Sequence, residues 1–297
     1  MYKMATLSDA TLQQYLINLS TIAREVGADI NDKDWVVKNW TNIKIYLESI
    51  ENLHTRKSKV CAVLFTDHLH PLPATISFYL KRKVQLLLNA INERYATNIK
   101  NDKQKANWVD LTDIDEKIDE LEDEITTEIT FENYKNILRY LILIFHKAIP
   151  VRNDLVRSKI IYDDEPHDNP EYNYILINEK VFIMNNYKTK KMYGQKRLTI
   201  PPVITDAFDM YLPILKHFSP QGFFYAKLNS EQQTSVQFTK LFNSIWESEG
   251  MKVGSTQIRR SVVSDLYDVD HEQKKQELAD KMCHAVSTAS LIYAKKN

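Results

Sequence analysis

The chain has 297 residues, 43% of them hydrophobic and 26% charged, which is typical of a globular protein long enough for two domains. Only 5 residues are glycine, which excludes collagen-like, glycine-rich and turn-dense all-β chains and favours helices. The 39 basic and 39 acidic residues cancel, which at first argues against a nucleic-acid partner.

The cysteine content and the absence of long apolar runs predict the cellular setting. Two cysteines, Cys61 and Cys283, are too few for a disulfide framework, so we expect an intracellular, reducing location and no secretion. We expect no signal peptide, because the N-terminal segment MYKMATLSDA has no apolar core. No apolar run approaches the roughly 18 residues of a membrane span, so no membrane partner is expected.

The neutral total conceals an uneven distribution of charge. Residues 110–132 contain eleven acidic residues and a single base, Lys117. The rest of the chain therefore has 38 bases against 28 acids. An excess of bases outside residues 110–132 is compatible with DNA binding but does not demonstrate it.

The first hundred residues predict an all-α domain. Apolar residues recur at helical spacing in four stretches, which are 12–17, 35–50, 60–64 and 76–91. We therefore predict a compact helical DNA-binding domain over residues 1–104, which ends in a polar linker at 98–105. Two basic clusters supply its candidate DNA contacts, which are Arg56, Lys57, Lys59, Lys81, Arg82 and Lys83. Taken alone, such a cluster is more often a solvated helix face.

Residues 105–297 predict a second domain that begins with helices. The acidic segment has a single apolar stripe, at Ile114, Ile118, Leu121 and Ile125. We interpret it as an amphipathic helix with a charged outer face; the alternative is an acidic surface that repels DNA or docks a basic neighbour. A buried helix follows at 134–147, and Pro150 ends it.

From Tyr172 onward, strand patterns precede further helices. Stretches rich in Ile, Val, Phe and Tyr predict a small antiparallel three-stranded sheet with strands at 172–177, 180–184 and 197–200. Helical spacing then recurs at 203–218, 235–247, 258–268, 275–282 and 287–296. The predicted fold class is therefore α+β and mostly helical.

The second domain has no motif for nucleotide hydrolysis, a zinc site or a serine hydrolase, so we expect no metal and no cofactor. It has instead an ordered series of charged elements. Arg152 follows the buried helix, and Lys188 lies in the turn of a predicted hairpin. Arg259 is in the first turn of a helix, and His284 precedes Tyr293 by nine residues.

In this order and spacing the chain resembles the tyrosine recombinase (phage integrase) family over residues 108–297. The resemblance implies an enzyme that cleaves and rejoins double-stranded DNA through a 3′-phosphotyrosine intermediate, without metal or ATP. It implies strand exchange through a Holliday junction by a homotetramer on DNA, with a monomer or dimer in its absence. It also implies integration of a viral or mobile element, in the host nucleus or a viral replication compartment.

The resemblance gives each matched residue a role whose chemistry can be stated independently. Arg152 and Arg259 would clamp the phosphate oxygens, since guanidinium groups form charge-assisted, bidentate bonds. Tyr293 would attack phosphorus, and Lys188 on its hairpin would protonate the leaving 5′ oxygen. His284 would support this catalysis.

Neighbouring residues leave alternatives open. Arg157 competes with Arg152, and Lys190 and Lys191 share the basic turn of Lys188. If Arg260 replaced Arg259, the helix would have to rotate by about 100°, which would turn its apolar stripe the wrong way. We therefore assign a second group as candidate phosphate contacts, namely Thr256, Lys190 and Arg260.

One departure from the family pattern supports a rival hypothesis: Thr256 stands where the family usually has histidine and cannot act as a base near neutral pH. Cys283 replaces the usual glycine before His284, and a residue this small should be tolerated. The nearest rival is a type IB topoisomerase, which uses the same chemistry as a monomer. A second is a DNA-binding protein of this fold without catalysis, and a third is a helical interaction protein in which the matches are accidental.

Overall fold

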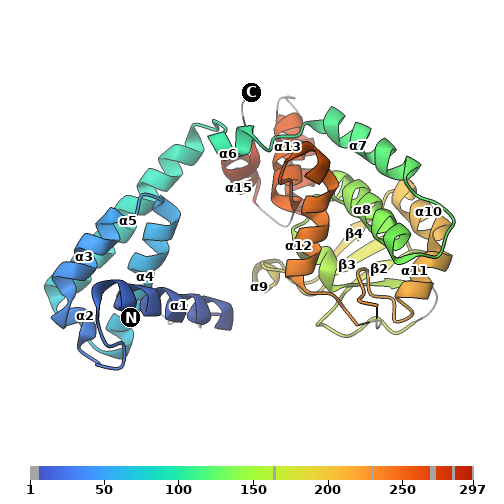
Figure 1. Ribbon diagram of the computed structural model, residues 1–297. Helices are drawn as coiled ribbons and strands as arrows, with labels where there is room; N and C mark the ends of the chain where they lie inside the picture. The colour runs from blue at the N-terminus through green and yellow to red at the C-terminus, as the bar shows by residue number, and fades with distance from the viewer. Residues whose placement is uncertain (1–6, 163–164, 229–230, 268–271, 283–284, 296–297) are drawn as a thin grey trace. The chain divides into compact units, whose positions relative to one another are not determined.

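The computed structural model describes residues 7–162, 165–228, 231–267, 272–282 and 285–295. The chain divides into two compact units, residues 1–97 and 98–297, each with its own hydrophobic core (Figure 1). Within the described residues, no helix has both the length and the apolar character needed to cross a membrane.

Unit 1 is helical throughout its described part. Its helices are α1 (Asp9–Val26), α2 (Trp35–Lys38), α3 (Trp40–Ser49), α4 (Leu53–Leu69) and α5 (Ala74–Ala96). Helix α4 packs against both α1 and α5, and Ile22, Ile43 and Val60 are fully buried between the helices. The described residues form five helices rather than four, because the non-helical backbone of Asn39 separates α2 from α3.

The predicted linker contains a short helix, α6 (Asp102–Lys105). A capping box begins it: the Asn101 side chain accepts from the Gln104 N–H, and the Gln104 side chain accepts from the Asn101 N–H, both at 2.9 Å. These reciprocal bonds satisfy backbone donors that would otherwise have no partner in so short a helix.

Unit 2 is built around one buried helix, α8. Its first helices are α7 (Leu111–Asp123) and α8 (Phe131–Ala148), and the 3₁₀ turn η1 (Asn153–Arg157) follows. After the strands come α10 (Pro202–Met210), α11 (Leu212–Phe218), α12 (Ser235–Asn243), η2 (Ser244–Glu249), α13 (Ser255–Tyr267), α14 (Glu272–Lys281), α15 (Val286–Thr288) and the π-helical turn η3 (Ala289–Tyr293). Helix α8 contacts α7, α10, α11, α12 and α13, so it forms the centre of this core.

The acidic helix α7 buries its apolar stripe, with Ile114 and Leu121 inside the unit 2 core. Its single base, Lys117, is also buried and pairs with Glu120 and with Glu249 of η2. The amphipathic interpretation of this segment is therefore confirmed.

The α+β, mostly helical class is confirmed, but the prediction of a three-stranded antiparallel sheet is wrong. The sheet has four strands in the order β1 (Ser158–Ile161), β2 (Asn173–Leu176), β3 (Val181–Met184) and β4 (Lys196–Thr199). Strands β2, β3 and β4 form the predicted antiparallel meander, and β1 pairs with β2 in parallel. Figure 1 shows α8 between this sheet and α7.

Strand β1 was missed because its apolar residues show no period-2 alternation. Ile160 packs with the helical core, whereas the adjacent Ile161 joins a small cluster on the other face of the sheet. Backbone bonds from outside the sheet also hold β1: the Ile160 N–H donates to the Gly222 carbonyl at 2.6 Å, and the Phe224 N–H donates to the Ser158 carbonyl at 2.9 Å.

We expect Gly222→Ala to destabilise unit 2 by about 2 kcal/mol or more. Gly222 has φ +75, and a Cβ there would lie 2.8 Å from the Ile160 carbonyl oxygen. The matched control is Gly250→Ala, where φ is +70 but the added Cβ meets no described atom within 4 Å. Urea unfolding should show the larger loss at Gly222; equal losses would contradict a close contact with β1.

Candidate active site

The segment after α8 holds the backbone of Arg152 from two sides. Arg152 precedes η1 and is half-buried. Its N–H donates to Asp154 Oδ2 at 3.2 Å, and its carbonyl oxygen lies 3.1 Å from His146 Nε2. The main chain that carries this arginine is therefore fixed by a side chain within the turn and by a helix in the core.

His146 is a site residue that the sequence analysis missed. It is fully buried, and its Nδ1 lies 2.8 Å from the Ile142 carbonyl oxygen. Burial lowers its pKa to about 4, although the two carbonyl contacts oppose the shift. A neutral imidazole has one N–H, so it donates to one of the two carbonyls, depending on its tautomer. The available signal was a histidine inside an otherwise apolar helical stretch.

Helix α13 presents two consecutive arginines in different directions. Its apolar residues Ile258, Val262 and Val263 are buried in the unit 2 core. Arg259 is 1% exposed, whereas Arg260 is partly exposed, because successive helical residues are about 100° apart.

Tyr293 packs directly on Arg259. The Arg259 Cζ lies 4.8 Å from the centroid of the Tyr293 ring, and Tyr293 is 7% exposed. The turn η3 is held on α13 by Ser264, whose hydroxyl accepts from the Lys295 N–H at 2.7 Å and donates to the Tyr293 carbonyl at 3.4 Å. Together with α15 this turn spans Val286–Tyr293, so the helix predicted at 287–296 ends at Tyr293.

Asp154 connects the two arginines. Burial raises the pKa of its carboxyl, and the positive charges of Arg152, Arg259 and Arg157 oppose that rise. The carboxyl therefore lies in the field of both catalytic candidates and of the competing Arg157. The candidate site thus has Arg152 and Asp154 near Arg259 of α13, and Tyr293 of η3 packs on that arginine.

The lysine candidates lie outside this packed group. Strands β3 and β4 are antiparallel neighbours, and Lys188 is exposed on the connection between them. Lys190 begins the short helix α9 (Lys190–Tyr193) in the same connection and is half-buried. His284 and Cys283 lie outside the described residues.

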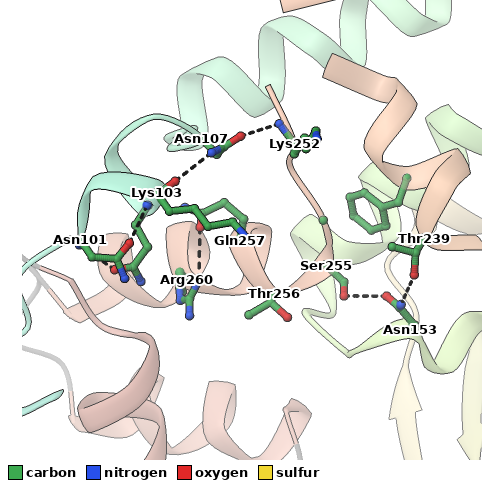
Figure 2. Close-up of a pocket in the computed structure, with 13 residues that line it drawn as sticks. Asn101, Lys103, Asn107, Asn153, Thr239, Lys252, Ser255, Thr256, Gln257 and Arg260 are labelled. Atoms are coloured by element: carbon green, nitrogen blue, oxygen red, sulfur yellow. Dashed lines mark hydrogen bonds between the residues drawn. The ribbon is translucent and has the colours of Figure 1, made fainter. Parts of the chain in front are cut away.

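The remaining phosphate-contact candidates line a cavity at the N-terminal end of α13. Thr256 is exposed in the first helical turn, and Arg260 lies one turn further on (Figure 2). Asn153 lies at the same cavity and connects η1 to α12 and α13. Its amide nitrogen donates to the Thr239 hydroxyl at 2.9 Å, and its amide oxygen accepts from the Ser255 hydroxyl at 2.7 Å.

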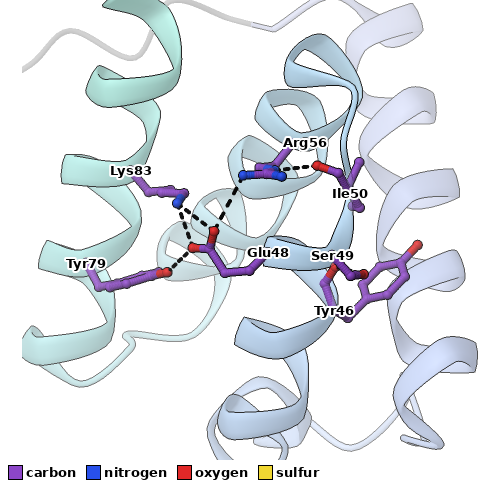
Figure 3. Close-up of polar contacts among 7 residues, drawn as sticks. All are labelled: Tyr46, Glu48, Ser49, Ile50, Arg56, Tyr79 and Lys83. Carbon is purple, nitrogen blue, oxygen red and sulfur yellow. Dashed lines mark hydrogen bonds and ion pairs between the residues drawn. The ribbon is translucent and has the colours of Figure 1, made fainter. Parts of the chain in front are cut away.

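In unit 1, two of the six basic candidates have an internal partner, the carboxylate of Glu48 (Figure 3). Lys83 approaches it at 2.6 Å and Arg56 at 3.5 Å, and the Tyr79 hydroxyl donates to it at 2.6 Å. These bonds lower the pKa of Glu48, and burial together with this carboxylate raises the pKa of Tyr79 to about 12.

The other basic candidates differ in exposure. Lys59 is 8% exposed, with its Nζ 5.6 Å from the centroid of the Tyr46 ring, and burial lowers its pKa. Lys57 is half-buried. Lys81 and Arg82 are exposed, and Lys81 reaches Asp67 only at 3.9 Å. The basic side chains most accessible to a partner are therefore Lys57, Lys81 and Arg82.

Comparison with known proteins gives two structural likenesses. No protein-family model and no curated protein matches the sequence. The chain is similar to a crystal structure of XerA recombinase, with a TM-score of 0.47, 10% identity and coverage of 98% of this chain and 88% of that one. It is also similar to the XerH site-specific recombinase bound to difH substrate in a pre-cleavage complex, with a TM-score of 0.44, 9% identity and coverage of 97% and 95%.

We expect the free energy of unfolding to fall as the pH is lowered from 6.5 to 4, in part because of His146. Over this range the unfolded histidine gains a proton that the buried one does not accept, which costs about 3 kcal/mol when complete. His146→Gln removes this titration. Denaturant unfolding across this pH range should give a shallower pH dependence for the variant; equal slopes would contradict a strongly lowered pKa.

Proposed function

We propose that this chain is a tyrosine recombinase that cleaves and rejoins DNA strands through a covalent 3′-phosphotyrosine on Tyr293. The observation that carries this proposal is the packing of Tyr293 on Arg259, 4.8 Å from ring centroid to guanidinium carbon. A phenol beside a buried guanidinium, with Arg152 acting on the same carboxyl group, is an arrangement suited to a phosphodiester.

In the proposed reaction the Tyr293 oxygen forms a bond to phosphorus as the bond from phosphorus to the 5′ oxygen breaks. The phenol proton goes to solvent or to His284, and the 5′ oxygen receives a proton from Lys188. A free 5′ hydroxyl then attacks the phosphotyrosine, which reseals the strand and releases Tyr293. The covalent intermediate conserves the energy of the broken bond, so resealing needs no nucleotide.

The arginines have a separate task in this mechanism. Negative charge spreads over the phosphate oxygens in the transition state, and guanidinium groups aimed at those oxygens stabilise it without rearranging. His146 and Asp154 act as positioning residues because they hold the main chain of Arg152 rather than the phosphate.

Lys188 fits the role of proton donor because of its place in the fold. It lies on the connection of a hairpin, exposed and outside the packed group of Arg152, Arg259 and Tyr293. An exposed lysine on such a loop is accessible to bound DNA. Integration of a viral or mobile element and assembly as a tetramer stay predictions of the sequence analysis.

The decisive test is a covalent adduct. Wild-type protein incubated with supercoiled plasmid and then denatured should retain DNA bound to protein, and Tyr293→Phe should retain none, because only the phenolic oxygen can form the bond. The variant keeps the ring that packs on Arg259, so its thermal stability should stay close to that of the wild type.

The same experiment separates the rival hypotheses. Relaxation of the plasmid by a monomer would favour a topoisomerase, and bound DNA without any adduct would favour a binding protein that lacks catalysis. An adduct that persists in Tyr293→Phe would show that another residue is the nucleophile and would refute the assignment.

Unit 1 is proposed to bind the DNA backbone through its accessible bases. The double variant Lys81→Ala/Arg82→Ala should weaken DNA binding and reduce the slope of log affinity against log salt by about 2, since each phosphate contact contributes about one unit. Lys83→Ala is the control, because this lysine is paired with Glu48. It should lower thermal stability and leave the salt slope unchanged; an unchanged slope in the double variant would contradict the proposed contacts.

A further inference from the structure

The cavity at the N-terminal end of α13 has the composition of an anion site. Its volume is about 390 Å³, and three cationic side chains line it, those of Lys103, Lys252 and Arg260. None of the described residues that line it is acidic. The first turn of α13, a helix of 13 residues, adds the partial positive charge of a helix N-terminus.

A buried amide in this cavity points to a ligand. Gln257 is 7% exposed, and its Nε2 has no hydrogen-bond partner within the described part of the chain. Its Oε1 accepts from Arg260 Nη1 at 3.5 Å, which orients the amide (Figure 2). A buried donor without an acceptor is destabilising, and an anion bound in the cavity would remove that penalty.

The surrounding segments hold the rim of the cavity in place. The Lys252 N–H donates to Asn107 Oδ1 at 2.5 Å, and the Asn107 amide donates to the Lys103 carbonyl at 2.8 Å. These bonds join the chain before α7 to the chain before α13. Lys103, Lys252 and Thr256 are exposed, so the site is open to a polymer as well as to a small ion.

We propose that this cavity binds a second phosphodiester of the DNA strand, next to the one held by Arg152 and Arg259. The inference rests on the proposed function. The adjacent residues Arg259 and Arg260 serve two different places, with Arg259 against Tyr293 and Arg260 at the cavity. One rigid helix therefore holds two phosphate contacts at a fixed spacing, which sets the position of the strand relative to Tyr293.

The first experiment measures thermal stability of the full chain with inorganic phosphate as the probe. A ligand that binds only the folded protein raises its melting temperature. Gln257→Glu keeps the size of the side chain and the acceptor for Arg260 but replaces the amide donor with a charged oxygen. We expect phosphate to stabilise the wild type and the variant to lose most of that effect. An equal phosphate effect in both proteins would overturn the site.

The second experiment measures binding of a mixed-sequence DNA duplex at several salt concentrations, in the Tyr293→Phe background so that no cleavage intervenes. Lys103→Ala should reduce the salt slope by about 1. The matched control is Lys105→Ala, which removes an exposed lysine of the same short helix that does not line the cavity. Equal slopes for the two variants would overturn a DNA contact at this site.

The two experiments also separate this inference from the proposed function. Gln257→Glu can lose the stabilisation by phosphate while Lys103→Ala and Lys105→Ala give equal salt slopes. The site would then bind a free anion, and the proposal that it binds a DNA phosphodiester would be refuted. Success in both experiments, in a protein that never forms an adduct, would support the second phosphate site and refute strand cleavage.

Discussion

The contact between Arg259 and Tyr293 is the interaction on which the candidate site depends. A guanidinium that is 1% exposed has lost its water and must be compensated by its surroundings, and the face of an aromatic ring is one such group. Ser264 secures the arrangement by bonding to the backbone on both sides of Ala294. The segment from Tyr293 to Lys295 is thereby packed on the helix that carries the arginine, so the stability of this region and the geometry of the site depend on the same contacts.

A second constraint connects the site to the centre of the core. Helix α8 contacts five other helices and also carries His146, which lies against the carbonyl of Arg152. Because the imidazole is fully buried, the hydrogen bond that it donates to one of the two carbonyl groups lies in a low dielectric, where losing it is expensive. The backbone of Arg152 is thus positioned in part by the central helix of unit 2.

Several basic side chains that the composition counts as available are paired or buried inside the protein. In unit 1, Glu48 neutralises Arg56 and Lys83, and Lys59 is buried beside Tyr46. In unit 2, Lys117 is enclosed by two glutamates. Composition therefore overstates how many of the candidate bases can reach DNA, because a side chain held by an internal partner is less available to neutralise a phosphate.

The sequence alone determined the features that depend on neighbouring residues. Helical spacing predicted α8 and α13, stretches rich in Ile, Val, Phe and Tyr predicted β2, β3 and β4, and the order of the charged elements singled out Arg152, Arg259 and Tyr293. Tertiary structure alone decided the parallel strand β1, the burial of His146, the pairing of Lys83 with Glu48 and the different directions of Arg259 and Arg260. The physical reason is that periodicity records which side of an element is apolar, whereas a partner distant in sequence leaves no trace in the local pattern.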